Sequence, residues 1–175
     1  FGIGTVTTKR LCDLIEAMAL LPQDRYRLRL VLVGQGPEEA ALRTQAEKSG
    51  LQDRILFLGK RHDVIDLLKM SDLFVFPSEV EGLPNAVIEA ALAELPIAAC
   101  DIEGVIDVVQ NSQNAALAPP RSPSQFAHAI AHILDHPESA QKAAETVKKR
   151  AIQRYSVEAS ISAFHSNSSV FNISL

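Results

Sequence analysis

Short apolar runs alternate with longer amphipathic stretches along almost the whole chain. The short runs favour buried β-strands, and the stretches whose apolar residues recur every three or four positions favour helices. Strands are expected at residues 28–34, 54–59, 72–78, 96–100 and, more weakly, 114–120, and the opening FGIG resembles the end of a further strand. Helices are expected at residues 7–21, 37–50, 63–70, 84–94 and 104–110, and throughout the chain after Pro123.

Capping residues indicate where several of these helices begin and end. Thr7 or Thr8 suits the N-cap of the first helix. Pro37 and Pro84 fit the first helical turn, and Gly50 fits the position just after a helix.

Strands that alternate with helices indicate βαβ units, and hence a parallel sheet covered by helices on both faces. We therefore expect an α/β, doubly wound, Rossmann-like fold with right-handed connections and a helical C-terminus. Residues 1–165 are expected to form one domain whose first strand is truncated, so the chain is interpreted as a fragment. The polar tail, residues 166–175, breaks the helical periodicity and is a candidate for disorder.

Composition narrows the classes of partner. The formal net charge is −4 and only 5% of residues are aromatic, with no Trp. Nucleic-acid binding requires a basic face or stacking platforms, so nucleic acid is not expected as a partner. No membrane span or signal segment is evident, which favours a reducing, cytoplasmic setting. Cys12 and Cys100 lie in apolar segments and are interpreted as small core residues.

Unusual residues cluster where the expected strands end. In open α/β sheets, ligands bind outside the carboxyl ends of the strands. The residues at these ends are Gly4, Gly34 and Gly36, Gly59 to His62, Ser78 to Asn85, and Asp101 to Gly104. Such loops also need Gly, Ser and Asp for conformational reasons, so the clustering alone leaves the ligand site open.

Lys9 and Arg10 follow the first of these strands. Adjacent cations at the carboxyl edge could neutralise a diphosphate. The alternative is a solvated pair in the first helical turn, where positive charge is mildly unfavourable.

Glu81 and Glu89 are the strongest candidates for ligand binding. Glu81 precedes the helix that begins near Pro84, and Glu89 lies within two turns of its start, in an otherwise apolar segment. A buried carboxylate needs hydrogen-bond donors, which ligand hydroxyls, a backbone cap or a nearby Arg could supply. The helix start should also offer free N–H groups, at Leu83, Asn85 and Ala86, to an anion.

His128, His132 and His136 are spaced as a metal ladder on one helix. The apolar stripe of that helix lies on its opposite face, so a solvent-facing row is favoured and no metal site is expected.

The segment PSEVEGLPNAVIEAALAELP resembles the E-x7-E signature of retaining glycosyltransferases with the GT-B fold, the large group called family four. GTVTTKRLCDLIEAMALL, LVLVGQGP, RILFLGKRHDVIDLLKMSDLFVFPS and RYSVEASISAF resemble, in order, further segments of the C-terminal, donor-binding domain of that group. The resemblance implies transfer of a sugar from a nucleoside-diphosphate sugar to an acceptor hydroxyl with retention, without metal, as in polysaccharide biosynthesis.

The resemblance also implies a role for each site residue. Glu81, the catalytic acid of the motif, would contact hydroxyls of the transferred sugar, and Glu89 would accept hydrogen bonds from the ribose hydroxyls. Lys9 or Arg10 would bind the diphosphate, and Arg61 would lie over the nucleobase. The other donor-binding positions would be Gly4, Gly82, Leu83 and Asn85.

Three departures from the family pattern affect this interpretation. Thr5 stands where Arg is usual, Glu94 stands where Gly is usual, and DIEGV replaces a run of paired glycines. The N-terminal, acceptor-binding half of a GT-B enzyme is absent from the chain. We therefore expect nucleotide-sugar binding without transfer, and any peripheral membrane association would run through that absent half.

Two other classes stay open. One is a non-catalytic nucleotide-binding domain, and the other is a nucleotide-sugar epimerase of the same architecture. The donor sugar, its base and the acceptor are not legible from the sequence.

Overall fold

The computed structural model describes residues 2–5, 10–110 and 115–155 of the chain. Its strands form two three-stranded parallel sheets, ordered β1-β2-β3 and β4-β5-β6. The strands are β1 (Gly2–Thr5), β2 (Leu30–Val33), β3 (Ile55–Phe57), β4 (Phe74–Phe76), β5 (Ile97–Cys100) and β6 (Ala116–Ala118).

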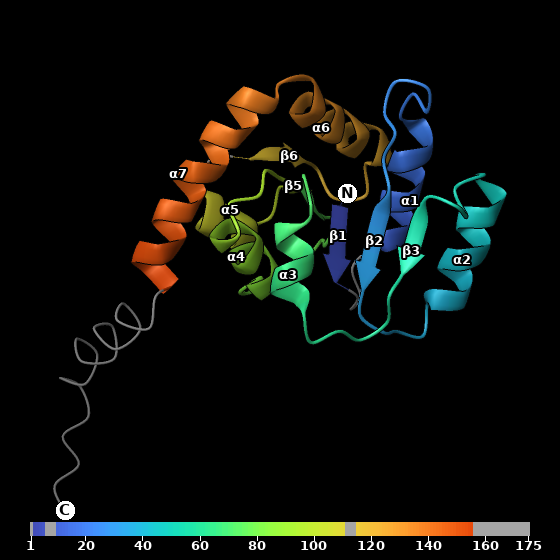
Figure 1. Cartoon of the computed structure of the whole chain (residues 1–175), viewed down its shortest axis with the longest axis horizontal. Helices are drawn as coiled ribbons and strands as arrows, with labels where there is room; N and C mark the ends of the chain where they lie inside the picture. The colour runs from blue at the N-terminus through green and yellow to red at the C-terminus, as the bar shows by residue number, and fades with distance from the viewer. Residues whose placement is uncertain (1, 6–9, 111–114, 156–175) are drawn as a thin grey trace, which may run out of the picture.

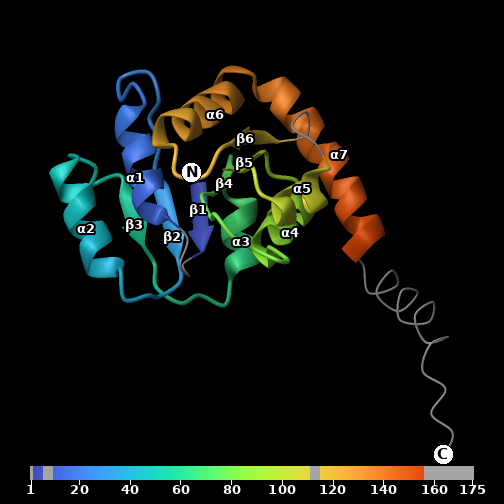
Figure 2. The same cartoon turned by 180° about the vertical axis from the view of Figure 1, so that it is seen from behind.

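Strands β1 and β4 lie side by side between the two sheets, so the strands follow the order 3-2-1-4-5-6 (Figure 2). This is the strand order of a doubly wound Rossmann fold. The winding reverses as the chain passes from β3 to β4, so the adjacent strands β1 and β4 flank the switch point, and ligands of such folds bind in the crevice at their carboxyl ends.

Seven helices among the described residues cover the two faces of the sheet (Figure 1). Helices α1, α2 and α6 pack on one face, and α3, α4, α5 and α7 pack on the other. The helices are α1 (Leu11–Leu20), α2 (Glu39–Lys48), α3 (Val64–Lys69), α4 (Asn85–Leu92), α5 (Glu103–Val109), α6 (Pro123–Asp135) and α7 (Pro137–Tyr155).

Each face of the sheet has its own hydrophobic core. Side chains of a strand point alternately to the two faces, so Leu30 and Leu32 join the core beneath α1 and α6. Val31 and Val33 join the core on the opposite face. All four side chains are buried, which is why the segment is apolar throughout and does not alternate with polar residues. The expected fold class is confirmed.

The beginnings of three helices differ from the expectation. Helix α1 begins at Leu11, after Arg10 in a left-handed conformation (φ 52°), which a right-handed helix cannot include. The expected caps, Thr7 and Thr8, lie outside the described residues. Helix α2 begins at Glu39, two residues after Pro37, and α4 begins just after Pro84. The stop at Gly50 is confirmed by its φ of 67°.

Glu94, which stands where Gly is usual in the family pattern, lies two residues after the end of α4. Its φ is 61°, in the region that favours glycine, which gives a physical reason for the usual Gly at this position. Its carboxylate lies 2.7 Å from Lys148 Nζ, and this ion pair lowers the pKa of Glu94. The pair joins the end of α4 to α7.

The two cysteines differ, so the expectation that both lie in the core is only half right. Cys100 ends β5 and is buried, whereas Cys12 is exposed on α1. Burial raises the pKa of Cys100 to about 12. Because thiolate is the reactive form, we expect a disulfide reagent at pH about 8 to modify Cys12 alone in the folded chain. Modification of both thiols before unfolding, measured by mass spectrometry, would contradict the burial of Cys100.

The predicted boundary at residue 165, the tail 166–175 and the final helix from residue 156 all lie outside the described residues. They stay predictions. No helix in the described ranges is both long and apolar enough to cross a membrane.

Candidate functional site

The acidic loop, residues 77–84, connects β4 to α4 at the carboxyl edge of the sheet. Strand β4 is buried throughout, so the loop starts from a rigid base. Ser78 is only 1% exposed, and its hydroxyl donates to Oε1 of Glu81 at 3.0 Å. The buried hydroxyl therefore fixes the first acid of the motif next to the crevice between β1 and β4.

The beginning of α5 packs closely against the backbone of the acidic loop. A Cβ atom added to Gly104 would lie 2.4 Å from the carbonyl oxygen of Glu81 and 3.0 Å from that of Gly82. Only glycine allows backbone to approach this closely. The loop after β5 thus has a structural task, holding the backbone of the two motif residues.

Glu89 lies on the exposed side of α4. Val87, Ile88, Ala90 and Ala91 face the core, whereas Asn85, Glu89 and Leu92 are exposed. The expectation of a buried carboxylate is therefore wrong, because Glu89 falls on the helical stripe i, i+4, i+7 that points away from the core. Within the described residues Glu89 accepts no side-chain hydrogen bond. Its carboxylate is open to solvent and available to an incoming ligand.

The start of α4 offers fewer free N–H groups than expected. The N–H of Asn85 donates to the carbonyl of Leu83 at 3.0 Å, so it is already occupied. The N–H groups of Leu83 and Ala86 donate to no backbone carbonyl in the described part of the chain. These two remain oriented at the positive end of the helix dipole, where an anion is favoured.

Arg10 lies at the carboxyl edge just before α1. Its guanidinium donates to both carboxylate oxygens of Asp13, at 2.9 and 2.8 Å. These hydrogen bonds raise the pKa of Arg10, and the charge of Glu79 in the acidic loop adds a smaller contribution in the same direction. Arg10 and the acidic loop thus lie at the same edge of the sheet, Arg10 after β1 and the loop after β4. Lys9 lies outside the described residues.

Arg121 is a residue that the sequence reasoning missed. It follows β6, and its Nε and Nη2 donate to the two carboxylate oxygens of Glu79, at 2.6 and 3.2 Å. Arg121 and Glu79 are 42 positions apart, so no local pattern couples them. The sequence indicated only that Arg121 and Glu79 each follow an expected strand, and so lie at the same edge of the sheet.

The remaining predicted positions lie along the same edge. Arg61 follows β3 and pairs with Asp63 through two hydrogen bonds of 2.8 and 2.6 Å, and both side chains are partly exposed. Gly59 accepts a hydrogen bond from the N–H of Gly34, which brings the loops after β2 and β3 together. Gly4 lies within β1, one residue before its end, and not after the strand as expected.

An apolar cavity of about 300 Å³ lies away from this edge, at the amino ends of the strands. Leu30 begins β2, Leu73 precedes β4, and both line the cavity together with Leu14 of α1. Its size does not make it the functional site, because the motif residues and charged groups gather at the opposite, carboxyl edge.

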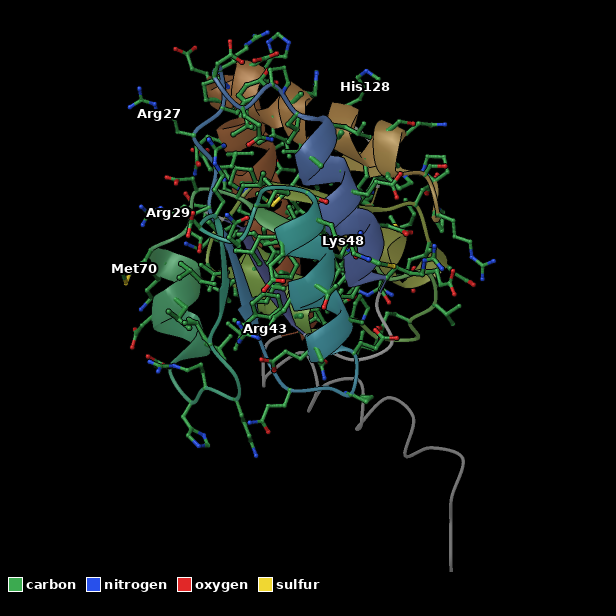
Figure 3. All side chains as sticks on the ribbon, turned by 90° about the vertical axis from the view of Figure 1, so that its right-hand side faces the viewer. Arg27, Arg29, Arg43, Lys48, Met70 and His128 are labelled. Atoms are coloured by element: carbon green, nitrogen blue, oxygen red, sulfur yellow. The ribbon has the colours of Figure 1, made fainter. Side chains whose placement is uncertain are left out.

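The three histidines are exposed, as the sequence predicted, but only His128 and His132 belong to α6, because the helix ends at Asp135. His128 projects from the surface (Figure 3). The rings of His132 and His136 are 4.8 Å apart. Among the described residues, no group of three or more His, Cys, Asp and Glu side chains could hold a metal ion.

Ser78 provides a direct test of how Glu81 is oriented. We expect Ser78→Ala to cost about 1 kcal/mol of unfolding free energy, the typical value for a lost hydrogen bond. Chemical denaturation measures this cost. A change below about 0.3 kcal/mol would show that the bond to Glu81 contributes little in solution.

Comparison with known proteins assigns most of the chain to a family. The family model described as "Glycosyl transferases group 1" matches residues 4–150. EpsD of Bacillus subtilis (strain 168) is 34% identical over 141 residues, which are 81% of this chain and 37% of EpsD. The N-acetyl-alpha-D-glucosaminyl L-malate synthase of Bacillus anthracis is 27% identical over 156 residues, 89% of this chain and 41% of that protein.

The fold also matches solved structures. HepE of Anabaena, solved in complex with UDP and glucose, superimposes with a TM-score of 0.88 and 25% identity, over 98% of this chain and 48% of HepE. TarM of S. aureus, solved with UDP, matches with a TM-score of 0.86 and 22% identity, over 94% of this chain and 34% of TarM. The chain thus spans less than half the length of these proteins.

Proposed function

Because the chain belongs to the group 1 glycosyltransferases, we propose that it is the donor-binding domain of a retaining enzyme. That enzyme would transfer a sugar from a nucleoside-diphosphate sugar to an acceptor hydroxyl. One observation carries the proposal: the acidic loop with Glu81 lies at the point where the strand order reverses, within range of the charge of Arg10. Complexes of the similar HepE with UDP and with UDP-glucose support the donor class.

The two acids of the motif bind different parts of the donor. Glu81, held by Ser78, contacts the hydroxyls of the transferred sugar and is the proposed catalytic acid. Glu89 is exposed on α4 and accepts hydrogen bonds from the ribose hydroxyls. The carboxylate of Glu89 is thus retained on an apolar helix for its ligand, and solvent satisfies it when the ligand is absent.

Cations and backbone dipoles would receive the charge of the leaving diphosphate. Arg10 and Lys9 are the proposed cations, Gly82 and Leu83 contribute through the backbone before α4, and Asn85, whose N–H is occupied, contributes through its exposed side chain. Fixed positive groups stabilise negative charge that develops in a transition state, which is a task that metal ions perform elsewhere. We therefore propose a metal-independent reaction. Arg61 and Gly4 complete the donor site on the nucleobase and phosphate sides.

The acceptor side of the crevice belongs to sequence outside this chain. The chain covers 37% to 41% of the relatives EpsD and the malate synthase. We propose that an N-terminal domain binds the acceptor, that the chain alone binds donor but transfers nothing, and that the whole enzyme acts in cytoplasmic polysaccharide biosynthesis. Chromatography of the products would detect sugar transfer. Transfer by these 175 residues alone would contradict the proposal that a separate domain must bind the acceptor.

Calorimetric titration tests donor binding. The chain is titrated with UDP, GDP and ADP and with their glucose conjugates. Saturable binding of at least one nucleoside diphosphate is expected, and binding of none would overturn the proposal. Interconversion of the bound sugar without an acceptor would instead identify an epimerase.

A further inference from the structure

We propose that Arg121 is a positioning residue that neutralises Glu79 and so keeps this carboxylate from opposing diphosphate binding at Arg10. The inference rests on the proposed donor function and concerns two residues to which the sequence analysis assigned no role. Arg121 follows β6 and Glu79 follows β4, so their pairing links two loops at the carboxyl edge.

The geometry of the pair is well suited to this task. Arg121 presents Nε and Nη2 to the two oxygens of one carboxylate, at 2.6 and 3.2 Å, which is the bidentate arrangement specific to arginine. Arg121 itself has a φ of 58°. A non-glycine residue is uncommon in this region, so the sequence accepts an unfavourable backbone conformation at a position whose side chain reaches across to Glu79.

Glu79 without this partner would work against anion binding. It lies between Ser78 and Glu81 in the acidic loop and interacts electrostatically with Arg10, the proposed diphosphate ligand. An unneutralised carboxylate there repels a diphosphate and competes with it for Arg10. Arg121 donates to both carboxylate oxygens of Glu79, and these hydrogen bonds lower the pKa of Glu79.

Two ion pairs lie near one another at this edge, Arg10 with Asp13 and Arg121 with Glu79. Removing Arg121 leaves the charge of Glu79 unbalanced and lowers the net charge near Arg10 by one unit, without removing a predicted ligand of the phosphates. The expected defect is therefore electrostatic and should be reversed by removing the charge of Glu79.

The test is a double-mutant cycle on binding of UDP, GDP and ADP to the whole chain by calorimetry. Arg121→Gln is expected to weaken binding of the preferred diphosphate about fivefold to tenfold, the effect of one nearby charge in a solvated site. Glu79→Gln should bind at least as tightly as the wild type, and the double variant should match Glu79→Gln. The deficit of Arg121→Gln should shrink at roughly 0.5 M salt, where exposed charges are screened.

Arg25→Gln is the matched control. Arg25 also forms an exposed ion pair, 2.7 Å to Asp135 at the end of α6, away from the acidic loop. Removing the charge of Arg25 should leave diphosphate binding unchanged. A double variant as weak as Arg121→Gln would overturn the proposal, since Arg121 would then be a direct ligand. Unchanged binding by Arg121→Gln would overturn it too. If the wild type binds no diphosphate, it is the donor function that fails.

Discussion

Glu89→Gln is expected to weaken binding of the preferred nucleoside diphosphate by about tenfold to a hundredfold. A hydrogen bond to a charged group contributes about 1.5–3 kcal/mol, and replacement by the amide removes the charge while it keeps the shape. Because Glu89 is exposed and bonds to no side chain in the described part of the chain, the melting temperature should not change. Calorimetry and thermal unfolding on the same samples separate the two effects.

The ribose contact can be isolated by changing the ligand as well as the protein. The wild type should bind a 2′,3′-dideoxynucleoside diphosphate more weakly than the parent nucleoside diphosphate. In Glu89→Gln the difference in affinity between these two ligands should be much smaller. Glu47→Gln, an exposed glutamate on α2, is the control and should behave as the wild type. Equal discrimination by wild type and Glu89→Gln would show that another group binds the ribose.

The fold follows from the sequence because its signals are local. Leu30 to Val33 form one apolar run that is too short for a helix, and its side chains belong alternately to the two hydrophobic cores. Gly50 occupies a left-handed position that glycine adopts without cost, so its presence already indicated the end of a helix. The strand order was not predicted, because alternation of strands and helices indicates a parallel sheet but does not specify that the winding reverses after β3.

The site was only partly accessible from the sequence, because exposure and pairing depend on residues that are distant in the chain. The apolar neighbours of Glu89 suggested burial, but an eight-residue helix buries one side only and leaves every third or fourth position exposed. Arg10 was expected in a helical turn and instead precedes the helix. The ion pair of Glu79 with Arg121 depends on the strand order, which places the ends of β4 and β6 at one edge.

Gly104→Ala should disturb the same site from the protein interior. The new methyl group would meet the carbonyl oxygens of Glu81 and Gly82 at 2.4 and 3.0 Å, so either the loop or α5 must move. Overpacking of this kind typically costs about 1–3 kcal/mol, and the gain in helix propensity from alanine offsets up to about 1 kcal/mol of that cost. Chemical denaturation should therefore show a net loss of stability.

Donor binding should fall in the same variant by more than the loss of stability explains. The variant should stay folded at room temperature, but the backbone of Glu81 should move relative to Arg10, so the two residues can no longer contact the donor together. Gly82→Ala is the matched control for stability, since a Cβ there meets nothing within 4 Å. If Gly104→Ala binds a nucleoside diphosphate as tightly as the wild type, the close approach of α5 serves packing alone and the acidic loop is positioned by β4 and Ser78.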